Sequence, residues 1–392
     1  MTHDTHAHAP LDGLKVVELA RVLAGPFAGQ TLADLGAQVI KVESPEGDDT
    51  RHWGPPWVTR EDGSREAAYY HACNRGKLGV TADFKNPDDL AFVRELCADA
   101  DVVIENFKTG GLARFGLDYE SLSVANPRLV YCSITGFGHD GPYAAYPGYD
   151  FVTQGMGGFM SLTGEPDREP VKFGFSMSDL TCGLYSVIAI QAALAQRTRT
   201  GRGQQIDMAL LDCTVGLLTN QALYYLVSGE NPPRMGNAHA QVAPYQVYEM
   251  ADGHLIVATG NDGQFHRLAR IIGREDLATD PRLQDNSGRL ENRDWMNAEI
   301  AREMLRYTRA QMMMECEAHA VPVGPVNRMD EVFANPQVKA RGMQISLPEG
   351  LPGVRTPITF SEAKLVLEKA SPRHGEHNAL LRKTAKDVQN DN

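Results

Sequence analysis

Short apolar runs alternate with helical stretches along the first half of the chain. Runs rich in Val, Ile and Leu predict buried strands, and they cover residues 14–20, 37–43, 77–84, 101–107 and 129–137. Between them, apolar residues recur at helical spacing, as over 25–36 and in the segment opened by Asn86 and Pro87. Strands that alternate with helices form βαβ units, so we expect an open Rossmann-like parallel sheet with helices on both faces.

The pattern changes in the second half. A short strand and a long apolar helix are expected within 204–229, and the segment ENPPRMGN then breaks the periodicity. Two alternating runs flank Ala251-Asp252-Gly253 and predict a β-hairpin. Helices are expected over 262–272 and 292–318, followed by a loop.

These changes of pattern predict the domain organisation. We expect a large α/β domain over 11–228 and a smaller α+β domain over 229–330. Residues 331–392 contain only short strands and turns, so we expect them to pack back on the large domain. Residues 1–10 are polar and predict a disordered tail.

Polar residues follow several of the predicted strands. Ligands of open α/β sheets bind beyond the carboxyl ends of the strands, and these ends carry Arg21, Glu43, Asn106, Phe107 and Thr135. Basic residues recur in the same places, namely Arg21, Arg51, Arg75, Lys77, Lys108 and Arg114. One such residue is typically a solvated surface charge, but their repetition favours an anion site. The connection between the first two predicted strands, residues 21–37, lacks the G-x-G-x-x-G pattern, so the dinucleotide fingerprint is absent there.

A single carboxylate, Asp179, stands at the start of a strongly patterned helix. Small residues surround it in the sequence, at Gly174, Ser176, Ser178 and Gly183, which would let a large ligand approach. The alternative is a capping role, because Ser176 to Asp179 fits the S-x-x-D pattern of a helix N-terminus. The local pattern alone favours the cap.

The glycine- and aromatic-rich stretch 135–158 allows two interpretations. It is either a long connection leading to a helix with Asp150 as its N-cap, or a functional loop. In the second case His139, Tyr146 and Tyr149 would line a cavity.

Composition and charge narrow the functional classes. The net charge of −12 over 392 residues argues against nucleic acid or an anionic membrane as the main partner. Six scattered cysteines form no C-x-x-C pair, which predicts free buried thiols and neither a metal site nor disulfides. No apolar run approaches the ~18 residues of a membrane span, and the polar start lacks a signal region. We therefore expect a cytoplasmic protein. A serine hydrolase is disfavoured because no G-x-S-x-G motif occurs.

Ordered motifs over residues 10–380 resemble the class III CoA-transferases, the family of formyl-CoA and carnitine CoA-transferases. The main ones are LKVVELARVLAGPFAGQTLADLGAQVIKVE, GDDTR, CNRGK, VIENFKTGGLARFGL, SITGFGHDGPYAAYPGYD, TGRGQQIDMALLD and VPVGPVNRMDEVFANPQV. GDDTRHWGPPWV and AQVAPY are most similar to the succinyl-CoA:dicarboxylate, or glutarate-type, branch.

The resemblance implies a set of functional residues. Asp179 would be the nucleophile, and CoA would contact Arg21, Val22, Ala24, Lys77, Asn106, Phe107, Arg114 and Phe115. It also implies an interlocked homodimer, acyl-CoA and a carboxylic acid as substrates, and no tightly bound cofactor. Family racemases carry a histidine where this chain has Tyr149, and tyrosine is a poor base at neutral pH, so racemisation is disfavoured. Some transferases have a lysine where this chain has Thr135.

The expected reaction moves CoA from an acyl-CoA, here succinyl-CoA, to a dicarboxylic acid through an aspartyl anhydride and an aspartyl-CoA thioester. Candidates for binding the acceptor are Arg21, Arg51, Tyr149 and His239. The alternatives are an α-methylacyl-CoA racemase, an acyl-CoA hydrolase, or a CoA-binding protein without catalytic activity.

Overall fold

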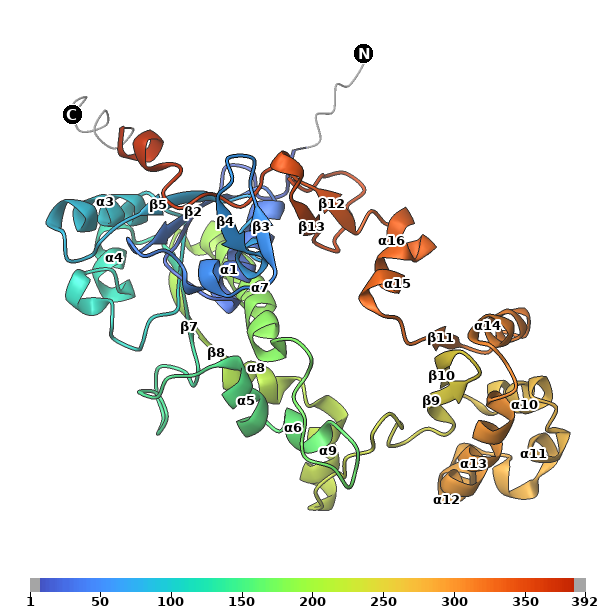
Figure 1. Cartoon of the computed structure of the whole chain (residues 1–392). Coiled ribbons are helices and arrows are strands. Elements are labelled where there is room, and N and C mark those ends of the chain that lie inside the picture. The colour runs from blue at the N-terminus through green and yellow to red at the C-terminus, as the bar shows by residue number, and fades with distance from the viewer. Residues whose placement is uncertain (1–7, 384–392) are drawn as a thin grey trace, which may run out of the picture. The chain divides into compact units, whose positions relative to one another are not determined.

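Contacts within the chain define two compact units. The structure, a computed structural model, describes residues 8–383. Among these, unit 1 comprises 8–159, 172–226 and 336–383, and unit 2 comprises 160–171 and 227–335 (Figure 1). Residues 160–171, which lie within the expected large domain, group with unit 2. Most of the expected N-terminal tail lies outside the described residues.

Unit 1 is built on a six-stranded sheet in which every pairing is parallel. The strand order is β5-β2-β1-β6-β7-β8, with bounds Leu78–Thr81, Gln38–Glu43, Lys15–Glu18, Val102–Glu105, Val130–Thr135 and Gln204–Ala209. This confirms the predicted open parallel sheet. The first five strands fall within the predicted apolar runs, and each is shorter than its run.

Successive side chains of a strand point to opposite faces of the sheet, so the buried strands present an apolar surface on each face. Helices cover both faces. Val16 belongs to the core that contains α1 (Ala24–Asp34) and α7 (Met177–Thr200). Its neighbour Val17 faces the other core, with α3 (Pro87–Ala98) and α4 (Tyr119–Ala125).

Helix α7 is long and apolar enough to cross a membrane by length and composition alone. Its buried residues Cys182, Val187, Ile190 and Ala193 pack in the core beside α1 and the sheet. This packing is that of a core helix.

The chain after β8 differs from prediction. A single long helix was expected, but the structure has α8 (Leu210–Gly216) and α9 (Thr219–Ser228). The break falls at Thr219, whose φ of 41° is left-handed. A β-branched residue rarely adopts this conformation, and the apolar pattern carries no sign of it. The remaining regular elements of unit 1 are η1 (Asp49–His52), β3 (Trp57–Thr59), β4 (Arg65–Ala67), α2 (Ala68–His71), η2 (Ala113–Phe115), α5 (Asp150–Met156), α16 (Pro336–Ala340), β12 (Gln344–Ser346), η4 (Pro348–Gly350) and β13 (Pro352–Val354).

Unit 2 contains a three-stranded antiparallel sheet packed with helices. The predicted hairpin is confirmed as β9 (Tyr245–Met250) and β10 (Gly253–Ala258), and β11 (Val323–Pro325) pairs with β10 inside the expected loop. The expected helix over 292–318 is two helices, because Thr308 and Gln311 form a capping box that starts the second. The helices are α6 (Phe159–Leu162, which begins at the boundary), α10 (Asp262–Ile271), α11 (Glu275–Thr279), η3 (Pro281–Leu283), α12 (Asn286–Glu291), α13 (Arg293–Met304), α14 (Arg309–Ala318) and α15 (Met329–Ala334).

The C-terminal segment covers the free edge of β5. Backbone N–H of Gly79 donates to His377 Nδ1 at 3.1 Å, and N–H of Thr81 donates to Asn378 Oδ1 at 2.9 Å. Arg382 donates to the carbonyl of Thr81 at 2.9 Å. Side chains thus satisfy backbone groups that an edge strand would otherwise leave open to another chain.

Candidate active site

A cavity of about 420 Å³ lies at the carboxyl ends of β1, β6 and β7 in unit 1. It brings together most of the residues expected from the sequence, namely Arg21, Val22, Ala24, Asn106, Phe107, Arg114, Tyr149 and Asp179. Asp179 is the single carboxylate among the described residues that line it. The strand ends therefore supply cations and amides, and α7 supplies one acid.

A second cavity of about 560 Å³ shares Arg21, Phe107 and Arg114 with the first. Phe115 lines this second cavity, and the Arg114 guanidinium carbon lies 4.6 Å from the centre of its ring. Phe84 contacts both Phe107 and Phe115. The two cavities together offer an extended site with aromatic and basic side chains where they meet.

Close packing of α7 against α1 sets the position of Asp179. Gly183 lies one turn after Asp179, and a Cβ there would come within 2.8 Å of the Ala24 carbonyl oxygen. Ser178 is also buried, with its Oγ 2.8 Å from Thr214 Oγ1. These two small residues hold the helices together, and the expectation that they leave space for a ligand is wrong.

The start of α7 is capped by a side chain from another helix. Asp150, the first residue of α5, accepts the backbone N–H of Ser178 at 2.8 Å and that of Asp179 at 3.3 Å. Ser176 occupies the N-cap position without a side-chain cap hydrogen bond. The predicted capping role therefore belongs to Asp150.

The ionisation of Asp179 also differs from expectation. Burial and the nearby Asp150 carboxylate raise the pKa of Asp179 to about 7. A helix N-terminus by itself favours the charged form of a carboxyl group. Asp150 places a negative charge at that terminus, so the aspartate is poised to titrate near neutral pH.

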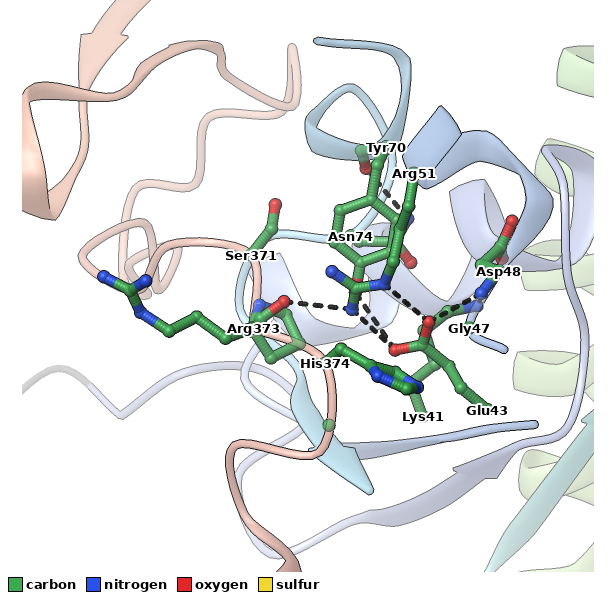
Figure 2. A network of polar contacts seen from close by, with 12 residues as sticks. Lys41, Glu43, Gly47, Asp48, Arg51, Tyr70, Asn74, Ser371, Arg373 and His374 are labelled. Carbon is green, nitrogen blue, oxygen red and sulfur yellow. Dashed lines mark hydrogen bonds and ion pairs between the residues drawn. The ribbon is translucent and has the colours of Figure 1, made fainter. Parts of the chain in front are cut away.

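Three of the expected ligand residues lie elsewhere. Lys77 is buried, and its Nζ donates to Glu18, Asn74 and the Pro26 carbonyl. Arg51 is buried and donates to Glu43, Glu66, Tyr70 and the Pro372 carbonyl, as part of the network in Figure 2. His239 belongs to unit 2, where its ring packs 5.2 Å from that of Tyr245.

Two glycines fix the loop that forms one wall of the cavity. A Cβ on Gly148 would come within 2.2 Å of the Gly136 Cα, so the two backbones touch. Both residues line the cavity, together with Ala144 to Tyr149. The cavity interpretation of the 135–158 stretch is thus favoured for Tyr146 and Tyr149. His139 instead lines a neighbouring cavity of about 240 Å³, and its Nε2 lies 2.7 Å from Ser133 Oγ.

Replacing Gly148 by alanine is expected to destabilise unit 1 by about 1–3 kcal/mol, because the added methyl group must force the two backbones apart. Thermal unfolding measures the change. Gly216→Ala is the control, since its Cβ would meet nothing within 4 Å. An equal effect of both substitutions would contradict the close contact.

Sequence reasoning missed Gly136, Gly148 and Asp150 as parts of the site. Asp150 was recognised as an N-cap candidate, but of its own helix. The P-G-Y-D run could have indicated Gly148 and Asp150, since glycine beside aromatic residues in a long loop indicates a constrained backbone. It gives no indication of Gly136.

Within residues 8–383, no group of three His, Cys, Asp or Glu side chains is arranged to hold a metal ion. The six cysteines all lie in this range and are buried and free.

Comparisons with known proteins define the class. The family model for CoA-transferase family III matches residues 11–378, and the chain belongs to this family. It is therefore a CoA-transferase by family.

Several relatives match this chain over most of its length and most of their own. The chain is 54% identical to a protein of Agrobacterium fabrum named succinate–glutarate CoA-transferase, over 97% of both chains. It is 37% identical to succinyl-CoA:glutarate CoA-transferase of Homo sapiens, over 95% of this chain and 85% of that one. Among solved structures, a CAIB/BAIF family protein from Brucella suis matches with a TM-score of 0.89 and 59% identity, covering 96% of this chain and 99% of that one.

Proposed function

We propose that the protein transfers CoA from succinyl-CoA to a dicarboxylic acid such as glutarate, with Asp179 as the nucleophile. The observation that carries the proposal is the placement of Asp179 as the single carboxylate among the described residues of a cavity lined by basic and amide side chains. The names of the relatives supply the substrate class.

The reaction needs no external acid or base. The Asp179 carboxylate attacks the thioester carbonyl carbon and the C–S bond breaks. This step releases CoA thiolate and forms an acyl-aspartyl anhydride. The thiolate attacks the aspartyl carbonyl carbon, which releases the donor acid and forms an aspartyl-CoA thioester. The acceptor carboxylate and then the thiolate repeat these two steps in reverse and restore Asp179.

Arg21 is our candidate for binding the second carboxylate of the acceptor. It lines the cavity with Asp179 and is exposed, and its NH1 pairs with Asp49 at 2.7 Å. An exposed ion pair contributes little to stability, so a substrate carboxylate can compete with Asp49. Arg51 is less suited, because four protein groups already accept its hydrogen bonds.

An interlocked homodimer remains part of the proposal. Helix α7 exposes Leu184, Tyr185 and Ile188 beyond the turn that carries Asp179, and Ile188 is 61% exposed. Contiguous apolar surface of this kind marks interaction sites. Light scattering of the purified protein measures its mass, and a monomer would contradict this part.

Mass spectrometry of product mixtures tests the function. Succinyl-CoA incubated with glutarate should yield glutaryl-CoA and succinate in equal amounts. Free CoA without glutaryl-CoA would indicate a hydrolase, and deuterium uptake at the α-carbon of an α-methylacyl-CoA would indicate a racemase. Either result without exchange would overturn the proposal.

The pH dependence tests the ionisation of Asp179. We expect kcat/KM to rise with pH through a midpoint of about 7, because the nucleophile must be ionised. Asp150→Asn removes the neighbouring charge and should move the midpoint to lower pH, while its Oδ1 can still accept from Ser178. An unchanged midpoint would show that another group limits the rate.

A further inference from the structure

Val22 has a strained backbone at the wall of the cavity. Its φ of 71° lies in the left-handed region, which β-branched residues rarely adopt. Strain of this kind persists only where surrounding contacts impose it, and it gathers at functional sites. The contacts of Val22 therefore show what imposes it.

Both sides of the Arg21–Val22 segment are held by side chains. Asn106 accepts the Arg21 N–H at 3.0 Å and donates to the Arg21 carbonyl at 2.7 Å. The Val22 N–H donates to the two carboxylate oxygens of Asp48, at 3.3 and 3.2 Å. The Cys73 thiol lies 3.6 Å from the Val22 carbonyl oxygen.

Asp48 is itself fixed by a buried network. Its side chain is buried, and Lys41 Nζ lies 2.9 Å from Oδ2. Thr50 donates its backbone N–H and its hydroxyl to Oδ1, at 3.0 and 2.8 Å. The Asp48 N–H donates to Glu43, which Arg51 holds from the other side (Figure 2). The carboxylate therefore cannot follow Val22 if the turn relaxes.

We propose that Asp48 is a positioning residue, which holds Val22 in its left-handed conformation and so sets the Arg21–Ala24 segment against the CoA thioester. This segment leads into the N-terminus of α1, and Arg21, Val22, Leu23 and Ala24 all line the cavity that contains Asp179. The inference rests on the proposed function, because it takes this cavity as the site of the thioester.

A double-mutant cycle with Asp48→Asn and Val22→Gly tests the role. Asp48→Asn keeps one oxygen that can accept from Val22 but replaces the other by an NH2 group, which faces the Val22 N–H and either Lys41 or Thr50, so the turn loses one of its two acceptors. Glycine adopts positive φ without steric cost and does not need to be held. Calorimetric titration of the full chain with CoA, and kcat/KM for exchange, are measured for all four proteins.

We expect Asp48→Asn to weaken CoA binding and lower kcat/KM by roughly tenfold when Val22 is present. In the Val22→Gly background the same substitution should cost less than about threefold, relative to Val22→Gly alone. Equal losses in both backgrounds, or no loss in either, would overturn the proposal, since a role confined to balancing Lys41 does not depend on residue 22.

Two controls keep the outcomes separate. If Asp48→Asn does not fold, the cycle is repeated in a Lys41→Met background. That background has no buried Lys41 ammonium that would lose its Asp48 partner. Glu18, the other partner of Lys41, still pairs with Lys77 there. If the wild-type protein binds CoA but does not exchange it, the proposed function fails, while the binding cycle still decides the role of Asp48.

Discussion

Replacement of Asp179 by asparagine is expected to reduce CoA exchange by at least about 10⁴-fold, because the substitution removes the nucleophile and keeps the volume of the side chain. Mass spectrometry of the protein after incubation with succinyl-CoA should detect an aspartyl-CoA adduct in the wild type and none in the variant. Binding of CoA itself should persist, since the other residues that line the cavity are unchanged.

Asp212→Asn is the matched control. Asp212 also lies in the first turn of a helix, α8, and is exposed. We expect its replacement to change exchange by less than about twofold. Retained exchange in the Asp179 variant would exclude the covalent mechanism, whatever the control shows.

The difference in stability between the wild type and the Asp179→Asn variant should grow as the pH rises. A carboxyl group whose pKa is about 7 in the folded chain, against roughly 3.9 in an unfolded one, favours folding at low pH. This contribution is lost as the pH rises through 7. Asp179→Asn is therefore expected to raise the unfolding temperature relative to the wild type at pH 8, and much less at pH 5.

Replacement of Arg51 by methionine is expected to lower the free energy of unfolding by about 3–5 kcal/mol, because it leaves buried carboxylates without their partner. Arg51 is 5% exposed and bonds Glu43 through two nitrogens, at 2.8 and 2.7 Å. Burial opposes the ionisation of Glu43, yet hydrogen bonds from Arg51 and the charge of Lys41 hold its pKa below the ordinary value. Urea unfolding followed by tryptophan fluorescence measures the loss, since Trp53 and Trp57 lie next to η1 in the chain.

Arg65→Met provides the comparison for Arg51. Arg65 is exposed, with its guanidinium carbon 5.5 Å from the centre of the Trp57 ring. Its replacement should change the free energy of unfolding by less than about 0.5 kcal/mol. If Arg51→Met unfolds like the wild type and mainly raises KM for the acceptor acid, the ligand role first expected for Arg51 is correct instead.

The sheet was predictable because its signal is continuous along the chain. Val102, Val103 and Ile104 are fully buried, and a strand covered on both faces reads as an unbroken apolar run. The helix breaks at Thr219 and before Thr308 were not predictable in the same way. They depend on backbone conformation and on a capping box, and neither interrupts the spacing of apolar residues.

The site was predictable where residues follow strands and unpredictable where they meet across the fold. Arg21 comes three residues after the end of β1 and Asn106 comes directly after β6, so topology alone brings them to one edge. Lys77 stands directly before β5, at the amino end of that strand, and its ammonium turns inward to Glu18, because Gly29 leaves room for that carboxylate. The raised pKa of Asp179 comes from its burial and from the Asp150 carboxylate beside it, and nothing in the spacing of 29 residues indicates this contact.

The edge of β5 is made long before the segment that covers it. The hydrogen bond from Gly79 to His377 joins residues 298 positions apart. At about 5–20 residues per second, a ribosome needs roughly 15–60 s to produce the second partner after the first. Throughout that interval the nascent sheet has an open side, on which strands of a neighbouring polypeptide can add. The segment around His377 therefore acts last, as the closure that ends this period of exposure.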